Sequence, residues 1–193
     1  MKNIWIINQY IYIPGDCGNL RHYSLVKYLQ EGNWKFTLIT SNIEHLRNKK
    51  RITNDKDKFH NLKNVQIFCL RIFRWSNKIK FLRVLGMLEF MFKIIFVLPF
   101  IRIEKPDLII GSSPNLFSAF GAAIISVFYR VPFILEIRDL WPESLIQLKA
   151  FRKNSIFYFI LKSIEIFLVF FAKKIIIVME RGAEYYKSIG VEN

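Results

Sequence analysis

Residues 138–144, Arg-Asp-Leu-Trp-Pro-Glu-Ser, form the densest group in the sequence that could do chemistry. Asp139 closely follows an apolar run, and a carboxylate at the end of a buried strand can orient a hydroxyl group or accept its proton. Arg138 could keep that carboxylate ionised or bind an anion itself, and Trp141 offers a flat apolar face for a sugar ring. The proline and Glu143 also suit the first turn of a helix without any chemical role. We therefore predict Asp139 as a catalytic residue and leave Glu143 open between a substrate contact and a helix start.

A second candidate group lies in an N-terminal loop that contains Gly15 and Gly18 and leads into a helix with Arg21 and His22 in its first turn. The loop has neither the three-glycine spacing of a dinucleotide fingerprint nor the lysine of a P-loop. Glycines before a helix still let backbone amides and the helix dipole meet an anionic ligand, although a tight turn without a ligand explains them equally well. Arg21 could hold a phosphate or carboxylate. His22 could carry a proton or contact a sugar, or act as a capping or packing residue.

Ser112 and Ser113 follow another apolar run, where their hydroxyls could cap the next helix or contact a ligand. They lack the glycine frame of a nucleophile elbow. The three histidines show no metal-binding spacing, and the two cysteines are too few for a disulfide framework or a zinc site of their own. We expect no metal and no other cofactor.

Short apolar runs that alternate with helical patterns must position these residues. The predicted strands span residues 4–7, 34–40, 65–70, 108–111, 133–137 and 174–178, and the predicted helices span 20–31, 80–103, 117–129 and 155–172. Strands that are apolar throughout, separated by helices, are typical of a parallel sheet covered on both faces. The sequence thus predicts a doubly wound, Rossmann-like α/β fold in one domain, residues 1–193. Ligands of such sheets bind at the carboxyl ends of the strands, where all the candidate residues fall.

The net charge of +14 is concentrated between Glu44 and Arg83, where twelve basic residues stand against three acidic ones. Such a block could contact nucleic acid, an anionic membrane surface or only water. No nucleic-acid-binding motif accompanies it, so we expect no nucleic-acid partner. The apolar helices predicted at 80–103 and 155–172 contain charged residues, which favours packing within the protein or lying on a membrane over spanning it. Because the N-terminus is not a signal peptide, we expect a cytoplasmic protein peripheral to the inner face of the cell membrane.

Several of these segments resemble the N-terminal, acceptor-side domain of family 4 glycosyltransferases with the GT-B fold. The similarity is greatest to the bacterial subgroup of fucosamine transferases of the WbuB type. The matching segments are residues 6–10, 15–23, 37–41, 105–114, 132–144 and 172–178, of which 132–144 is the most specific. The resemblance covers nearly the whole chain.

The resemblance implies a retaining, metal-independent transfer of a sugar from a nucleotide-sugar donor to an acceptor, typically a lipid-linked glycan in surface polysaccharide synthesis. On this resemblance Asp139 takes the place of a catalytic or acceptor-orienting residue, and Gly15 and Gly18 correspond to the loop near the donor pyrophosphate. The residues that we expect to contact the acceptor are Arg21, His22, Ser112, Ser113, Arg138, Trp141 and Glu143.

The sequence departs from the family pattern in two places. Asp16 and Cys17 separate glycines that are usually adjacent, and Asp16 would bring a negative charge close to a pyrophosphate. The sequence also ends at Asn193, before the donor-binding domain of such enzymes, so we expect the chain to be inactive alone. The alternative is a non-catalytic membrane-surface binding module of the same fold.

Overall fold

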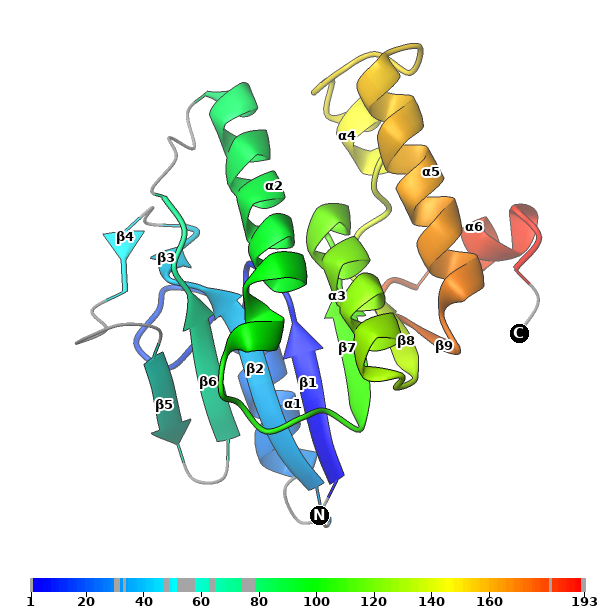
Figure 1. Cartoon of the computed structure of the whole chain (residues 1–193). Helices are drawn as coiled ribbons and strands as arrows, with labels where there is room; N and C mark the ends of the chain where they lie inside the picture. The colour runs from blue at the N-terminus through cyan, green and yellow to red at the C-terminus, as the bar shows by residue number, and fades with distance from the viewer. Residues whose placement is uncertain are drawn as a thin grey trace.

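The computed structural model of the chain describes residues 2–29, 32, 34–46, 49–51, 58–62, 65–73, 79–180 and 182–191. A seven-stranded sheet of order β5-β6-β2-β1-β7-β8-β9 forms its centre (Figure 1). The strands are β1 (Lys2–Ile7), β2 (Trp34–Ser41), β5 (Lys58–Leu62), β6 (Val65–Leu70), β7 (Leu108–Ser112), β8 (Phe133–Ile137) and β9 (Lys174–Ile177). Six of them pair in parallel, and β5 pairs antiparallel with β6 at one edge. A short separate ribbon pairs β3 (Ile43–Glu44) with β4 (Lys49–Lys50).

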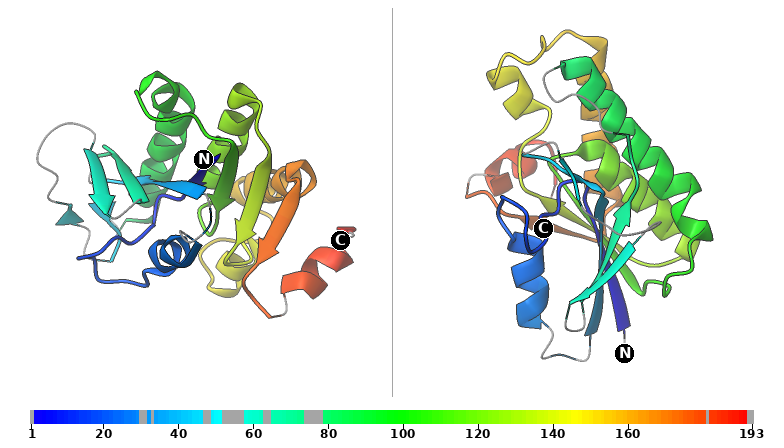
Figure 2. Two further views of the ribbon diagram at one scale, coloured as in Figure 1. Left: turned by 90° about the horizontal axis from the view of Figure 1, so that it is seen from below. Right: turned by 90° about the vertical axis from the view of Figure 1, so that its left-hand side faces the viewer.

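Helices cover both faces of the sheet (Figure 2). One face carries α1 (Arg21–Leu29), and the other carries α2 (Lys80–Phe96), α3 (Leu116–Tyr129) and α5 (Ile156–Phe171). The shorter helices are η1 (Leu98–Phe100), α4 (Glu143–Gln147) and α6 (Gly182–Ser188). The predicted doubly wound, Rossmann-like α/β fold is therefore confirmed.

Alternate residues of β1 fill the two cores of the molecule. Ile4 and Ile6 pack in the cluster that contains Val26 of α1. Trp5 and Ile7 pack in the larger cluster formed with α2, α3 and α5. Because neighbouring side chains of a strand point to opposite faces, a strand that is apolar throughout needs cover on both sides. This burial on both faces explains why the apolar strand pattern predicted a parallel sheet covered by helices on both sides.

The structure also contains elements that the sequence pattern did not predict. β5 lies in the polar connection before residue 65, where its backbone pairs with β6, so no apolar repeat is needed to form it. The helix predicted to reach residue 103 ends at Phe96, and Pro99 lies in the 3-10 turn η1. Proline lacks an amide hydrogen and its ring clashes with the preceding helical turn, which explains this end.

The two apolar helices are too short to span a bilayer. The longer, α2, has 17 residues, against roughly 20 for a spanning helix. Among the described residues no helix combines the length and the hydropathy that a membrane crossing needs.

Candidate functional site

The carboxyl ends of β7 and β8 bring Ser112 and Glu136 next to each other, because these residues are direct partners in the parallel register. The first turn of α1 lies against the same edge and contributes Arg21 and His22. We call Arg21, His22, Ser112 and Glu136 the Glu136 cluster. Three of its members were predicted as site residues, whereas Glu136 was recognised only as part of a strand.

Glu136 is the centre of this cluster and only 3% exposed. One carboxylate oxygen, Oε1, accepts hydrogen bonds from Nε and Nη2 of Arg21 at 3.2 and 3.1 Å. The other, Oε2, lies 2.8 Å from Nε2 of His22. A carboxylate can only accept, so the Nε2 atom of His22 carries the proton of this bond. Both oxygens are thus engaged by positively charged or proton-donating groups.

The environment of Glu136 stabilises its ionised form. Burial alone would raise the pKa of this carboxyl, but the hydrogen bond and charge of His22, a bond from Ser112 and the charge of Arg21 lower the pKa to about 2. A buried carboxylate that is paired in this way stays ionised near neutral pH and holds α1 against β8. The Glu136 cluster therefore stabilises the packing of α1 against the carboxyl edge of the sheet.

Ser112 and Ser113 connect the Glu136 cluster to the loops that follow β1 and β8. Ser112 Oγ lies 3.2 Å from His22 Nε2 and accepts a bond from Asn8 Nδ2 at 3.1 Å. The Ser113 hydroxyl accepts a hydrogen bond from the backbone amide of Arg138 at 2.8 Å. Both serines are buried. Their position fits a role in holding the loop after β8, and acceptor contact by Ser112 and Ser113 stays a prediction.

Gln9 and Asn115, which the sequence analysis did not single out as site residues, also build this edge. Gln9 donates to the carbonyl of Gly86 in α2 at 3.3 Å and accepts from Asn115 at 2.6 Å. Asn115 is in turn the N-cap of α3. A run of polar residues directly after a buried strand was the available signal, and its physical reason is that buried amides must find partners.

Asp139 lies just above the Glu136 cluster and is half-buried. Its Oδ2 atom accepts a hydrogen bond from the indole nitrogen of Trp141 at 3.1 Å, and no other described side chain donates to this carboxylate. The guanidinium of Arg138, also half-buried, has no carboxylate partner among the described residues. Asp139 and Arg138 thus keep hydrogen-bonding capacity at the carboxyl edge of the sheet, where such folds bind ligands.

The side chains of Trp141 and Glu143 pack against residues outside the Glu136 cluster. The Trp141 ring is buried among apolar side chains and lines a groove between α2 and α4. Glu143 accepts a hydrogen bond from Tyr158 at 2.8 Å and lies 3.6 Å from Lys162 Nζ, both on α5. As the first residue of α4 it also occupies the helix start that was the open alternative. Substrate contact by Trp141 and Glu143 stays a prediction.

The Gly15–Gly18 loop is a tight turn that a buried ion pair stabilises. Gly15 has φ +99°, which L side chains rarely adopt, and a Cβ at Gly18 would lie 2.4 Å from the Tyr12 ring. Asp16 pairs with Arg51, whose Nη2 lies 2.6 Å from Oδ2, and both side chains are almost fully buried. Arg51 therefore neutralises the negative charge that seemed to oppose a pyrophosphate next to this loop.

The structure joins most of the predicted site residues, but not all of them. The Glu136 cluster and the Arg138–Trp141 loop are connected through Ser113. The glycine loop lies near enough that Arg138 acts electrostatically on Tyr12, where it opposes the increase of that pKa caused mainly by burial. No hydrogen bond of the described residues joins Gly15 or Gly18 to Asp139, so a shared ligand between them stays a prediction.

Among the described residues, no group of three or more His, Cys, Asp or Glu side chains has the geometry to hold a metal ion. No protein-family model matches the sequence. The search of curated proteins likewise gives no match.

Proposed function

We propose that the chain is the acceptor-binding half of a retaining, metal-independent glycosyltransferase. It would hold a lipid-linked glycan acceptor at the inner face of the cell membrane during surface polysaccharide synthesis. The observation that carries the proposal is the contrast between two carboxylates, Glu136 in β8 and Asp139 just after it. Both carboxylate oxygens of the buried Glu136 accept hydrogen bonds from Arg21 and His22. Asp139, three residues later, is partly exposed and accepts a side-chain hydrogen bond from Trp141 alone among the described residues. The buried Glu136 pairs fix the position of the loop after β8, and the Asp139 carboxylate in that loop remains accessible to a ligand.

In the proposed reaction Asp139 accepts a hydrogen bond from the acceptor hydroxyl and orients it toward the anomeric carbon of the donor sugar. Arg138 binds an anionic group of the substrate, a role that suits a guanidinium with no carboxylate partner. The glycine loop presents backbone amides near the donor pyrophosphate, and the Arg51–Asp16 pair removes the repulsion that Asp16 alone would cause. A leaving nucleotide phosphate needs fixed positive groups, which we assign to a donor-binding domain that acts with this chain.

Sugar transfer with the two halves combined tests the proposal. The chain is mixed with the donor-binding domain of a family 4 glycosyltransferase, a panel of radiolabelled nucleotide-sugars and lipid-linked glycan acceptors in vesicles. Radiolabel in the lipid fraction that disappears with Asp139→Ala supports the proposal. Activity that survives Asp139→Ala refutes the site assignment.

The second candidate is a non-catalytic membrane-surface module of the same fold. It is favoured by the large apolar side chains that α2 and α5 leave exposed, including Phe92, Phe96, Phe159 and Phe170. Inactivity of the combined halves with every donor, together with firm vesicle binding, would favour this candidate.

A further inference from the structure

An apolar groove of about 540 Å³ lies between the beginning of α2 and the α4–α5 segment. Both segments extend beyond the carboxyl edge of the sheet (Figure 1), so the groove opens on the side of the candidate site. Its apolar lining includes Phe81, Val84, Trp141, Leu148, Ala150 and Phe157. Trp141 belongs to both places, since its ring lines the groove and its nitrogen donates to Asp139. The groove and the proposed catalytic carboxylate are therefore linked through Trp141.

The rim of the groove exposes large apolar side chains to solvent. Of the residues that line the groove, Phe81 is 68% exposed and Leu148 75%. Ile156, the first residue of α5 and the neighbour of the lining residue Phe157, is 80% exposed. Single exposed apolar residues are ordinary, but several around one apolar groove mark an interaction site. The exposed apolar side chains of the rim therefore indicate that a ligand or another surface covers them.

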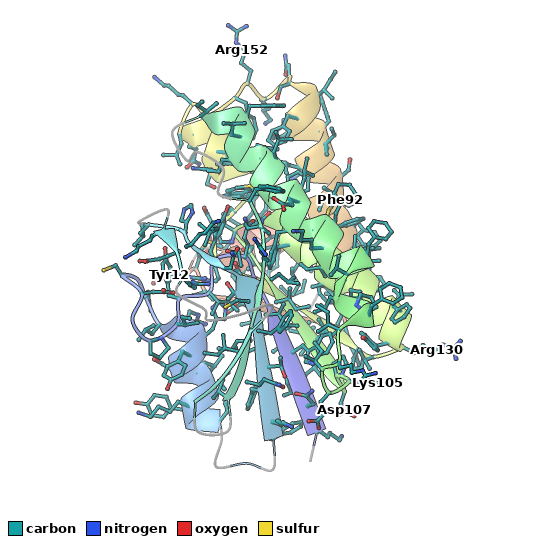
Figure 3. All side chains as sticks on the ribbon, turned by 60° about the vertical axis from the view of Figure 1, so that its left-hand side comes forward. Tyr12, Phe92, Lys105, Asp107, Arg130 and Arg152 are labelled. Atoms are coloured by element: carbon teal, nitrogen blue, oxygen red, sulfur yellow. The ribbon has the colours of Figure 1, made fainter. Side chains whose placement is uncertain are left out.

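The charged side chain in the lining of the groove is basic, and the acidic residues that flank the lining segments, Glu89 and Glu143, are paired with Lys93 and Lys162. Arg83 lines the groove, and Lys149, Arg152 and Lys153 lie in the α4–α5 connection; Arg152 is at the outer end of the molecule (Figure 3). Segments 79–88 and 144–164 contain no Asp or Glu. A second copy of the chain would bring the same positive charge and a net charge of +14, so self-association through this end is opposed. An anionic lipid supplies both the hydrocarbon and the negative charge that the groove and its rim lack.

We propose that the groove holds one hydrocarbon chain of an anionic lipid while its rim rests on the bilayer surface. With the chain in the groove, the lipid headgroup lies toward Arg138 and Asp139, because Trp141 lines the groove and is hydrogen-bonded to Asp139. The identification of this lipid as the carrier of the glycan acceptor rests on the proposed function. Insertion of the chain itself does not, and it is measured without a sugar donor.

Vesicle flotation tests the rim. Phe81→Ser combined with Leu148→Ser should weaken binding of the full chain to phosphatidylglycerol vesicles at least about tenfold, since two large apolar groups no longer leave water. The matched control is Phe100→Ser, at a residue 86% exposed in η1 near the opposite end of α2, which should leave binding within about twofold. Equal losses in the two variants, or no flotation of the unmodified chain, would overturn the proposal.

Fluorescence quenching tests the groove. In a Trp34→Phe, Trp75→Phe background the remaining tryptophans are Trp141 and the fully buried Trp5. Phosphatidylglycerol with brominated acyl chains should quench Trp141, and Trp141→Phe should abolish the response. Ala150→Phe fills the groove, so it should keep flotation and lose quenching. Val84→Phe fills it from α2 and serves as a second variant if Ala150→Phe fails to fold.

The outcomes separate the two proposals. Quenching that persists in a folded, groove-filled variant overturns the inference, and so does flotation without quenching in the background protein. Intact sugar transfer without quenching refutes the groove alone. Quenching without transfer supports the groove and refutes the proposed function.

Discussion

Two carboxylates three residues apart, Glu136 and Asp139, occupy opposite environments at the end of β8. Glu136 lies below the sheet edge, with both oxygens bonded to Arg21 and His22. Asp139 lies in the following loop, where the indole of Trp141 is its one side-chain donor among the described residues. A charge whose partners are all supplied by the protein stabilises the fold, whereas a charge with unused lone pairs is available to a ligand. The comparison separates the support of the site from the group that we propose acts on substrate.

The largest expected effect comes from Glu136→Gln, which leaves Arg21 and His22 without their carboxylate. Breaking a buried ion pair by removing one partner should lower the free energy of unfolding by about 3 kcal/mol. Asp139→Asn keeps an acceptor for Trp141 and should lower it by about 1 kcal/mol or less. Urea unfolding of both variants measures the difference. Equal losses would show that the two carboxylates do not divide support and function in this way.

The pH dependence of stability gives a second view of Glu136. Its pKa in the folded protein, about 2, lies below the ordinary value of 4.5. The stabilisation is therefore complete above pH 4.5 and is lost as the pH falls toward 2. The urea midpoint of the unmodified chain should fall more steeply across this interval than that of Glu136→Gln. Parallel curves would mean that Glu136 is not the group that titrates.

A smaller effect is expected in the glycine loop, which extends the comparison to the donor side. Gly15→Ala places a Cβ on a residue with φ +99°, at a cost of about 1 kcal/mol. Because open space surrounds that Cβ, the loss reflects backbone strain and not a clash. Asn19→Ala, at an exposed position of the same loop, is the control. Unfolding free energies of the two variants decide whether the turn is strained as described.

The smallest effect is expected for Glu143→Gln. Its bonds to Tyr158 and Lys162 tie α4 to α5 near the surface, and partly exposed pairs of this kind contribute about 0.5 kcal/mol. Sugar transfer by the combined halves should change by less than about twofold. A loss comparable to that of Asp139→Ala would instead support the predicted contact of Glu143 with the acceptor.

The sequence predicted the fold well because burial on both faces leaves a direct trace in it. The strands at 65–70 and 133–137 match β6 and β8 residue for residue. β5 was missed because an edge strand is held by backbone pairing to β6 and carries no two-sided apolar pattern. Helix ends were less exact, as α2 shows at Phe96.

The sequence analysis predicted some residues of the candidate site and missed others. Asp139, Ser112 and Arg21 were predicted as site residues because they follow strands or begin a helix, and their contact with a substrate stays a prediction. Glu136 is a charged residue inside an otherwise apolar strand, but its partner His22 is 114 residues away, and no local pattern links them. Arg51 could not be distinguished from the other cations of the basic block, since only the fold shows that it is buried against Asp16.

Binding of the acceptor to the chain alone tests the central claim most directly. A lipid-linked glycan in phosphatidylglycerol nanodiscs is titrated with the unmodified chain, Asp139→Asn and Glu143→Gln, with the fold of each checked by circular dichroism. Loss of a hydrogen bond to a charged group should weaken the affinity of Asp139→Asn about tenfold or more and leave that of Glu143→Gln unchanged. An unchanged affinity in folded Asp139→Asn would contradict the account.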